Sequence, residues 1–183
     1  MAAAALPGFD APAAGFEAPL EMLAACHGRV ERQCQTLSRL VPHLAANGPD
    51  QSAQAAAHNV MRYFDTSARH HHADEEDDLF PALLRAAPQA EFAHISELIS
   101  ALRAQHRELE QAWSTLRREL EGIGQGTIRT LDGDQVAAFV DLYRRHIDRE
   151  EAELLPDAAR IVGLAGLDTI GRAMRLRRGI NEV

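Results

Sequence analysis

Two stretches of the sequence share one pattern: HHADEEDDLFP at residues 71–81 and HIDREEAELLP at residues 146–156. Each reads His-x3-Glu-Glu-x2-Leu, followed by an apolar residue and Pro. Residues four apart lie on one face of a helix, so the histidine and the first glutamate of each stretch can serve one metal site. A single His-x3-Glu arises easily by chance, whereas the longer repeated phrase indicates that two helices carry the same function.

Apolar residues on both sides of these motifs recur at helical spacing. Four long segments show this periodicity, and breakers at 47–50, 81–88 and 122–126 separate them. Proline cannot continue a regular helix, so we expect Pro81 to end the regular part of the second helix and Pro156 to end the fourth. Signs of strands are few, and the sequence therefore predicts an all-α chain.

The expected architecture is an up-and-down four-helix bundle over residues 17–160. An N-terminal arm at 1–16 precedes it, and a short C-terminal helix or tail at 161–183 follows. Asp50 and Asp132 are the expected N-caps of the second and fourth helices, because each stands just before an apolar-periodic segment.

The composition limits the partners of the chain. Its 183 residues carry 27 acidic side chains and 19 basic ones, all of them arginine, for a net charge of −8. This balance argues against a nucleic-acid or anionic membrane partner, and the absence of lysine excludes Schiff-base chemistry. No run approaches the roughly 18 apolar residues of a membrane span, and Cys26 and Cys34 are too few for a disulfide framework. We expect a soluble, cytoplasmic protein.

Each of the four expected helices carries a histidine on its inward, apolar stripe, and two of them add a carboxylate. These residues are His27, His71, Glu75, His106, His146 and Glu150. A buried, unpaired carboxylate or imidazole costs several kcal/mol, so six such groups must either form a hydrogen-bonded polar core or bind cations. Nitrogen and oxygen donors of this kind suit iron, manganese or zinc, and we favour metal binding over a metal-free core.

From about Leu20 to Pro156 the sequence resembles the hemerythrin-like (HHE cation-binding) family, on the strength of the two repeated phrases. The resemblance implies two non-haem iron ions within the bundle, optionally joined by an oxo or hydroxo bridge. It also implies that the four histidines are terminal ligands and that Glu75 and Glu150 bridge the ions. Iron prefers five or six ligands, which leaves positions for dioxygen, nitric oxide or another small ligand.

The same resemblance implies a role in binding or sensing iron, dioxygen or nitric oxide, or in protecting iron centres under stress. A sensor of this kind would act through a separate protein partner. Two alternatives stay open. The first is a di-iron enzyme with peroxidase-like or nitric-oxide-processing activity, with Tyr143 beside the open positions. The second is a binding or storage protein for zinc or another divalent ion.

Two further carboxylates are candidate ligands. Oxygen-carrying hemerythrins have a second histidine one turn after the first on the third helix, and Glu110 stands at that position here. Glu31 follows His27 by one turn with similar geometry. The resemblance therefore does not by itself imply reversible oxygen carriage.

A one-residue slip that pairs His72 with Glu76 is a further alternative. We favour His71 with Glu75, because their spacing to the following Leu and Pro equals that in the second motif. Glu76 and Glu151 are then expected to face solvent or to contact the ligands from outside.

Overall fold

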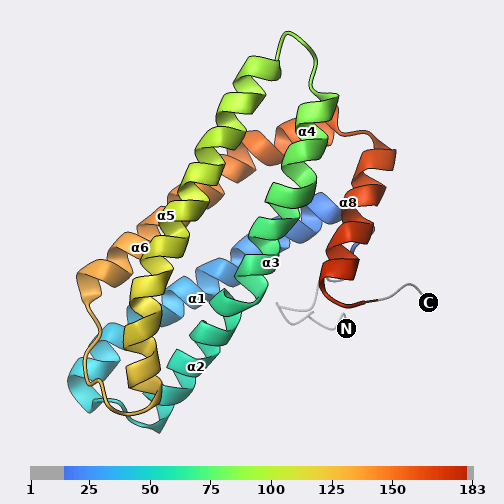
Figure 1. The fold of residues 1–183 in the computed structure, drawn as a ribbon. Coiled ribbons are helices and arrows are strands. Elements are labelled where there is room, and N and C mark those ends of the chain that lie inside the picture. Colours follow the sequence, from blue (N-terminus) through green and yellow to red (C-terminus); the bar gives the residue numbers. More distant parts are fainter. Residues whose placement is uncertain (1–14, 181–183) are drawn as a thin grey trace, which may run out of the picture.

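The computed structural model describes residues 15–180, in which the chain is helical between its turns and has no strand (Figure 1). The all-α prediction is confirmed. In chain order the elements are α1 (Pro19–Asn47), α2 (Gln51–Asp65), α3 (Ser67–Ala73), η1 (Asp74–Leu79), α4 (Phe80–Ala86), α5 (Phe92–Gly124), α6 (Gly133–Arg149), η2 (Glu150–Leu154), α7 (Leu155–Ile161) and α8 (Leu164–Arg177). Of the expected arm, residues 1–14 lie outside the described part.

The two predicted N-caps are present. The Asp50 side chain accepts a hydrogen bond from the backbone N–H of Ala53 at 2.8 Å. The Asp132 side chain accepts from the N–H groups of Asp134 and Gln135 at 2.9 and 3.2 Å. These bonds satisfy amide donors that have no partner within the first turn of a helix, so they fix where α2 and α6 begin.

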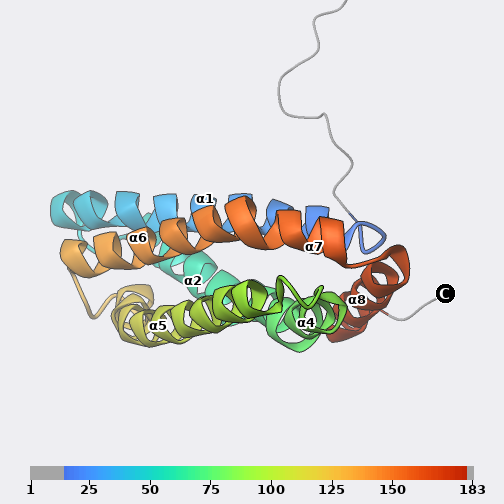
Figure 2. The same ribbon diagram turned by 90° about the horizontal axis from the view of Figure 1, so that it is seen from above.

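Four helical columns make up the body of the molecule. Two of them are single helices, α1 and α5; the other two are α2–α3–η1–α4 and α6–η2–α7, each running end to end (Figure 1). Helix α1 contacts both α2 and α6, and α5 also contacts both. Figure 2 shows α1, α6 and α7 in one layer, with α5 and α4 in the layer beneath. Within residues 15–180 no helix is both long and apolar enough to cross a membrane.

The elements η1 and η2 are π-helical turns, and each begins at or next to the glutamate of a repeated motif. The Phe80 N–H donates to the carbonyl of Glu75, and the Leu155 N–H donates to that of Glu150. Both bonds span five residues, one more than in an α-helix. Short π-helical segments occur often at functional sites.

The prediction that Pro81 and Pro156 end their helices is wrong. Both lie in the first turn of an α-helix, α4 and α7, that continues the same column. Proline in a regular helix removes a hydrogen bond and clashes with the carbonyl four residues earlier. Here a π-helical turn with longer-range bonds immediately precedes each proline, and a first-turn position tolerates its missing N–H. The column therefore continues past both prolines.

Buried apolar side chains form two clusters, with a polar layer between them. One cluster contains Phe139 and the other contains Phe80, and both side chains are fully buried. His106 lies on α5 between Leu102 of one cluster and Leu109 of the other. The apolar clusters thus surround a short polar section of each column, and this section is where the histidines lie.

Helix α8 covers the end of the bundle, where it contacts α1 and η1. Met174 belongs to the second apolar cluster, while Arg177 and Arg178 bind the fully buried Asp74 of η1. The Arg178 Nη2 atom lies 2.6 Å from Asp74 Oδ2. A short terminal helix was expected here, but the sequence could not show that its arginines neutralise a buried carboxylate. The domain limits near residues 16 and 160 stay predictions.

Candidate metal centre

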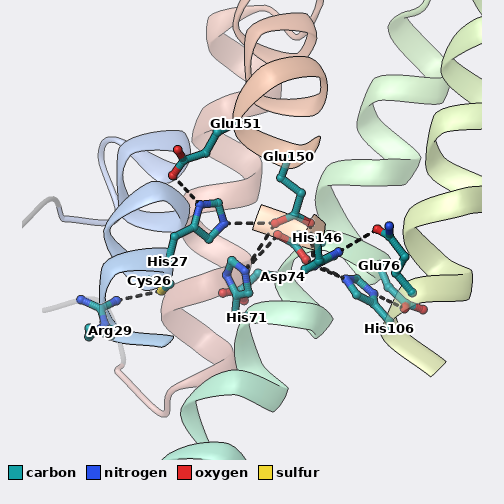
Figure 3. Close-up of polar contacts among 12 residues, drawn as sticks. Cys26, His27, Arg29, His71, Asp74, Glu76, His106, His146, Glu150 and Glu151 are labelled. Carbon is teal, nitrogen blue, oxygen red and sulfur yellow. Dashed lines mark hydrogen bonds and ion pairs between the residues drawn. The ribbon is translucent and has the colours of Figure 1, made fainter. Parts of the chain in front are cut away.

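Six buried side chains meet in the polar layer, and Figure 3 labels the four histidines and Glu150. They are His27 from α1, His71 from α3, Glu75 from η1, His106 from α5, His146 from α6 and Glu150 from η2. None is more than 2% exposed. All four columns contribute, and the six are the residues that the sequence singles out.

Within each motif, the histidine contacts the glutamate one turn later. His71 Nε2 lies 3.2 Å from Glu75 Oε1, and His146 Nε2 lies 3.1 Å from Glu150 Oε1. The i,i+4 spacing therefore brings an imidazole nitrogen and a carboxylate oxygen together on one face of each column.

The second oxygen of each carboxylate faces a histidine from the other half of the chain. His27 Nε2 lies 3.1 Å from Glu150 Oε2, and His106 Nε2 lies 3.3 Å from Glu75 Oε2. Each carboxylate is thus placed between two imidazoles from different columns. The arrangement repeats with approximate two-fold symmetry, as the repeated motif suggests.

The donor atoms form two overlapping groups of four, and within each group all atoms lie within 4.8 Å of one another. The first group is His27, His71, Glu75 and Glu150; the second is Glu75, His106, His146 and Glu150. Both carboxylates belong to both groups. Each group could hold one metal ion, with the two glutamates between the ions.

The electrostatics of the two carboxylates favour a cation. Burial, and then the charge of Glu150, raises the pKa of Glu75 well above its usual 4.5. Burial acts on Glu150 in the same direction, but the charge and hydrogen bond of His146, followed by the hydrogen bond of His27, hold its pKa well below that value. All four carboxylate oxygens are buried, and each faces an imidazole nitrogen at 3.1–3.3 Å. Cations would satisfy these oxygens and allow both groups to be ionised.

The outer nitrogens of three histidines have acceptors that fix the rings. His27 Nδ1 donates to Glu151 at 2.9 Å, and His106 Nδ1 donates to Glu76 at 2.6 Å. His146 Nδ1 donates to Gln105 Oε1 at 3.2 Å. A proton held on Nδ1 leaves the Nε2 lone pair directed at the centre, as a metal ligand requires. The second glutamate of each motif therefore contacts the site from outside.

The alternative candidates occupy different places. Glu31 and Glu110 are exposed and belong to neither group. Glu76 accepts a hydrogen bond from Nδ1 of His106, on the side of the ring that faces away from the centre. The alternative pairing of His72 with Glu76 therefore does not place both side chains at the site. His72 itself is directed inward and forms a further group with His106 and His146. Its four-residue spacing from the buried Ala68 is the signal in the sequence that would have indicated this position.

Comparisons with known proteins agree with this geometry. The Hemerythrin HHE cation binding domain family matches residues 18–158. An uncharacterised protein of Haemophilus influenzae is 33% identical over 169 residues, which cover 92% of this chain and 95% of that protein. The family match spans all four columns and every member of both donor groups. The chain therefore belongs to the hemerythrin HHE cation-binding family.

Proposed function

We propose that the protein binds two non-haem iron ions through His27, His71, Glu75, His106, His146 and Glu150. The observation that carries this proposal is the pair of four-donor groups that share both carboxylates. The up-and-down four-helix arrangement is part of the proposal, and the contacts of α1 and α5 with both α2 and α6 support it. Four imidazoles and two carboxylates match the nitrogen and oxygen donors that iron accepts.

Each ion would have four protein donors, while iron prefers five or six. The open positions give the centre its chemistry, which is the binding of a small ligand such as dioxygen or nitric oxide. The side chains of this protein hold the ions, fix the imidazole tautomers through Glu76 and Glu151, and exclude water with apolar clusters on both sides. We propose a role in binding or sensing these ligands or in protecting iron centres under stress. The cytoplasmic location and a protein partner stay predictions.

The proposal is tested by metal analysis and absorption spectroscopy of wild-type protein, Glu75→Ala and Glu150→Ala. The exposed Glu97 of α5 offers a control, Glu97→Ala. We expect two iron ions per chain in wild type and control, with a charge-transfer band after aerobic purification. Each bridging variant should hold one ion or none. Two tightly bound ions in either variant would refute the bridging role, and colourless protein fully loaded with zinc would refute iron.

A second candidate function is peroxidase-like or nitric-oxide-processing catalysis, which one further observation favours. A pocket of about 290 Å³ between α2, α3 and α5 is lined by residues that include His72, Glu110, Trp113, Arg117 and Tyr143. One of its lining residues, His72, stacks on His106 of the second donor group. Turnover of peroxide or nitric oxide above that of an equal amount of free iron would support an enzyme; turnover at the level of free iron would remove this candidate.

A further inference from the structure

His72 is a half-buried histidine that the six-residue centre does not use. It follows His71 directly in α3, and its Nε2 atom is buried with no hydrogen-bond partner among the described residues. An unpaired buried nitrogen is costly unless something binds it.

The ring lies against the second donor group. Its centroid is 4.0 Å from that of His106, with nearly parallel planes, and 5.8 Å from that of His146. One nitrogen of each of these three rings lies within 4.8 Å of the other two. Among the described residues, the donor group of His27 and His71 has no third imidazole of this kind.

We propose that His72 is a third imidazole ligand of the metal ion held by the second donor group. This rests on the proposed function. The second ion would then have five protein donors, namely His72, His106, His146, Glu75 and Glu150, while the first would keep four.

The competing role for His72 is structural. It lines the pocket that also contains Glu110, Trp113 and Tyr143, and its ring stacks on His106. The ring therefore separates this pocket from the centre. In that role, shortening the side chain would open a route for small ligands and leave the affinity for both ions unchanged. The two roles differ in what they predict for metal binding, and binding can be measured without any assay of activity.

The experiment compares wild type, His72→Ala, His72→Leu and the control His70→Ala, all loaded anaerobically with iron(II). Leucine fills the space of the ring but cannot bind metal, and His70 is the neighbouring histidine in no donor group. Competition with a chelator gives the affinity of each ion, and Mössbauer spectra of iron-57 protein report each coordination environment. Melting curves of the metal-free proteins show that all four fold.

We expect both His72 variants to keep one tightly held ion and to bind the other more than about 100-fold more weakly. Loss of a residue that only hydrogen-bonds a metal ligand lowers metal affinity by roughly 10–100-fold, so a larger loss indicates direct ligation. One of the two Mössbauer signals should change, and added imidazole should restore it in His72→Ala. Two ions with an affinity loss below 100-fold, or unchanged spectra, would overturn the proposal while leaving the di-iron function intact. A wild type that binds fewer than two ions would overturn both.

Discussion

Glu76 and Glu151 are half-exposed or exposed, yet each accepts a hydrogen bond from the outer nitrogen of a buried histidine. Substitution by alanine removes the acceptor that holds the proton on Nδ1, so the imidazole can turn or present the wrong nitrogen. We expect Glu76→Ala and Glu151→Ala to weaken metal binding by about 10–100-fold each. Chelator competition measures this.

The half-exposed Glu153 lies one turn from Arg149 and outside both donor groups. It provides the control Glu153→Ala, which should bind metal as wild type does. Affinity within twofold of wild type in both Glu76→Ala and Glu151→Ala would show that these carboxylates do not orient the rings. A change in only one variant would limit the effect to one donor group.

At the residue scale, the sequence was informative where one motif repeats. The matching positions of His71 and His146 identified the inward face, and the structure brings those side chains together. The inward position of His72 was missed, because neighbouring residues in a regular helix face different directions and His71 already occupied the inward face; only the four-residue spacing from Ala68 indicates it. Likewise, the contact of Glu151 with His27 spans 124 residues, so no local pattern reveals it.

The π-helical turn η2 is an element whose length can be tested. It has one residue more per turn than an α-helix, so deletion of one residue allows an α-turn with α7 still in register. Ala152 is exposed in η2 and suits such a deletion. We expect the deletion to leave the melting temperature of the metal-free protein nearly unchanged. It should, however, displace Glu150 and so lower the iron content of the protein. Circular dichroism and metal analysis test both effects.

The matched control deletes Ala138, which is exposed in the regular helix α6. Loss of one residue there rotates the helix on one side of the deletion by about 100°, which turns apolar residues to solvent. This variant should melt at a much lower temperature or fail to fold. Equal destabilisation by the two deletions would contradict the view that η2 contains an additional residue that the bundle does not need.

The N-cap of α6 gives a pH-dependent prediction. Hydrogen bonds from the Gln135 backbone and side chain and from the Asp134 N–H lower the pKa of Asp132 below its usual 3.8. A group whose pKa is lower in the folded state stabilises the protein above its unfolded pKa, and this contribution is lost as the pH falls through the folded value. Asp132→Ala should therefore lower the melting temperature at pH 7, and the difference from wild type should shrink below pH 3.8.

Melting curves of chelator-treated protein from pH 7 to pH 2 measure this difference without interference from the metal ligands. The neighbouring Asp134→Ala is the control, because its side chain does not cap the helix. A difference between wild type and Asp132→Ala that stays constant over the whole range would contradict a role for the ionised carboxylate.

Across the whole molecule, α8 is joined to the centre through Asp74, which is fully buried and bound by two arginines. The double variant Arg177→Ala/Arg178→Ala leaves this carboxylate buried without a counter-charge. We expect a loss of about 3–5 kcal/mol in the free energy of unfolding, measured by urea denaturation of the metal-free protein. In an Asp74→Asn background the same change should cost much less. An equal cost in both backgrounds would contradict the ion-pair explanation.

Metal removal should also affect the whole molecule. Each of the two ions binds only the folded arrangement of donors, so each stabilises it by about 4 kcal/mol when free metal is a thousandfold above its Kd. For a chain of this size, the loss of both contributions, about 8 kcal/mol, corresponds to a melting temperature lower by roughly 20 °C after chelation. Calorimetry before chelation, after chelation and after iron is added back measures this. A melting temperature that does not respond would show that the donors are satisfied without metal.

The whole-molecule arrangement was only partly accessible from sequence. Helix boundaries followed from Asp50 and Asp132, whose capping chemistry is local. The attachment of α8 depends on Arg178 meeting a carboxylate 104 residues earlier, which only the folded chain brings about. The sequence also did not reveal that the helical column continues past Pro81. That continuation depends on the π-helical hydrogen bonds of the preceding turn, which the folded chain forms.

Each of the two carboxylates contacts a histidine from the other half of the chain, and this determines when during synthesis the protein can bind metal. Both donor groups contain Glu75 from the first half of the chain and Glu150 from the second. During synthesis, a nascent polypeptide has neither set of donors complete until Glu150 has left the ribosome and its helix has docked. A metal ion could therefore meet a complete set of donors only after Glu150 has emerged, and a product truncated before Glu150 would have no complete set for either ion.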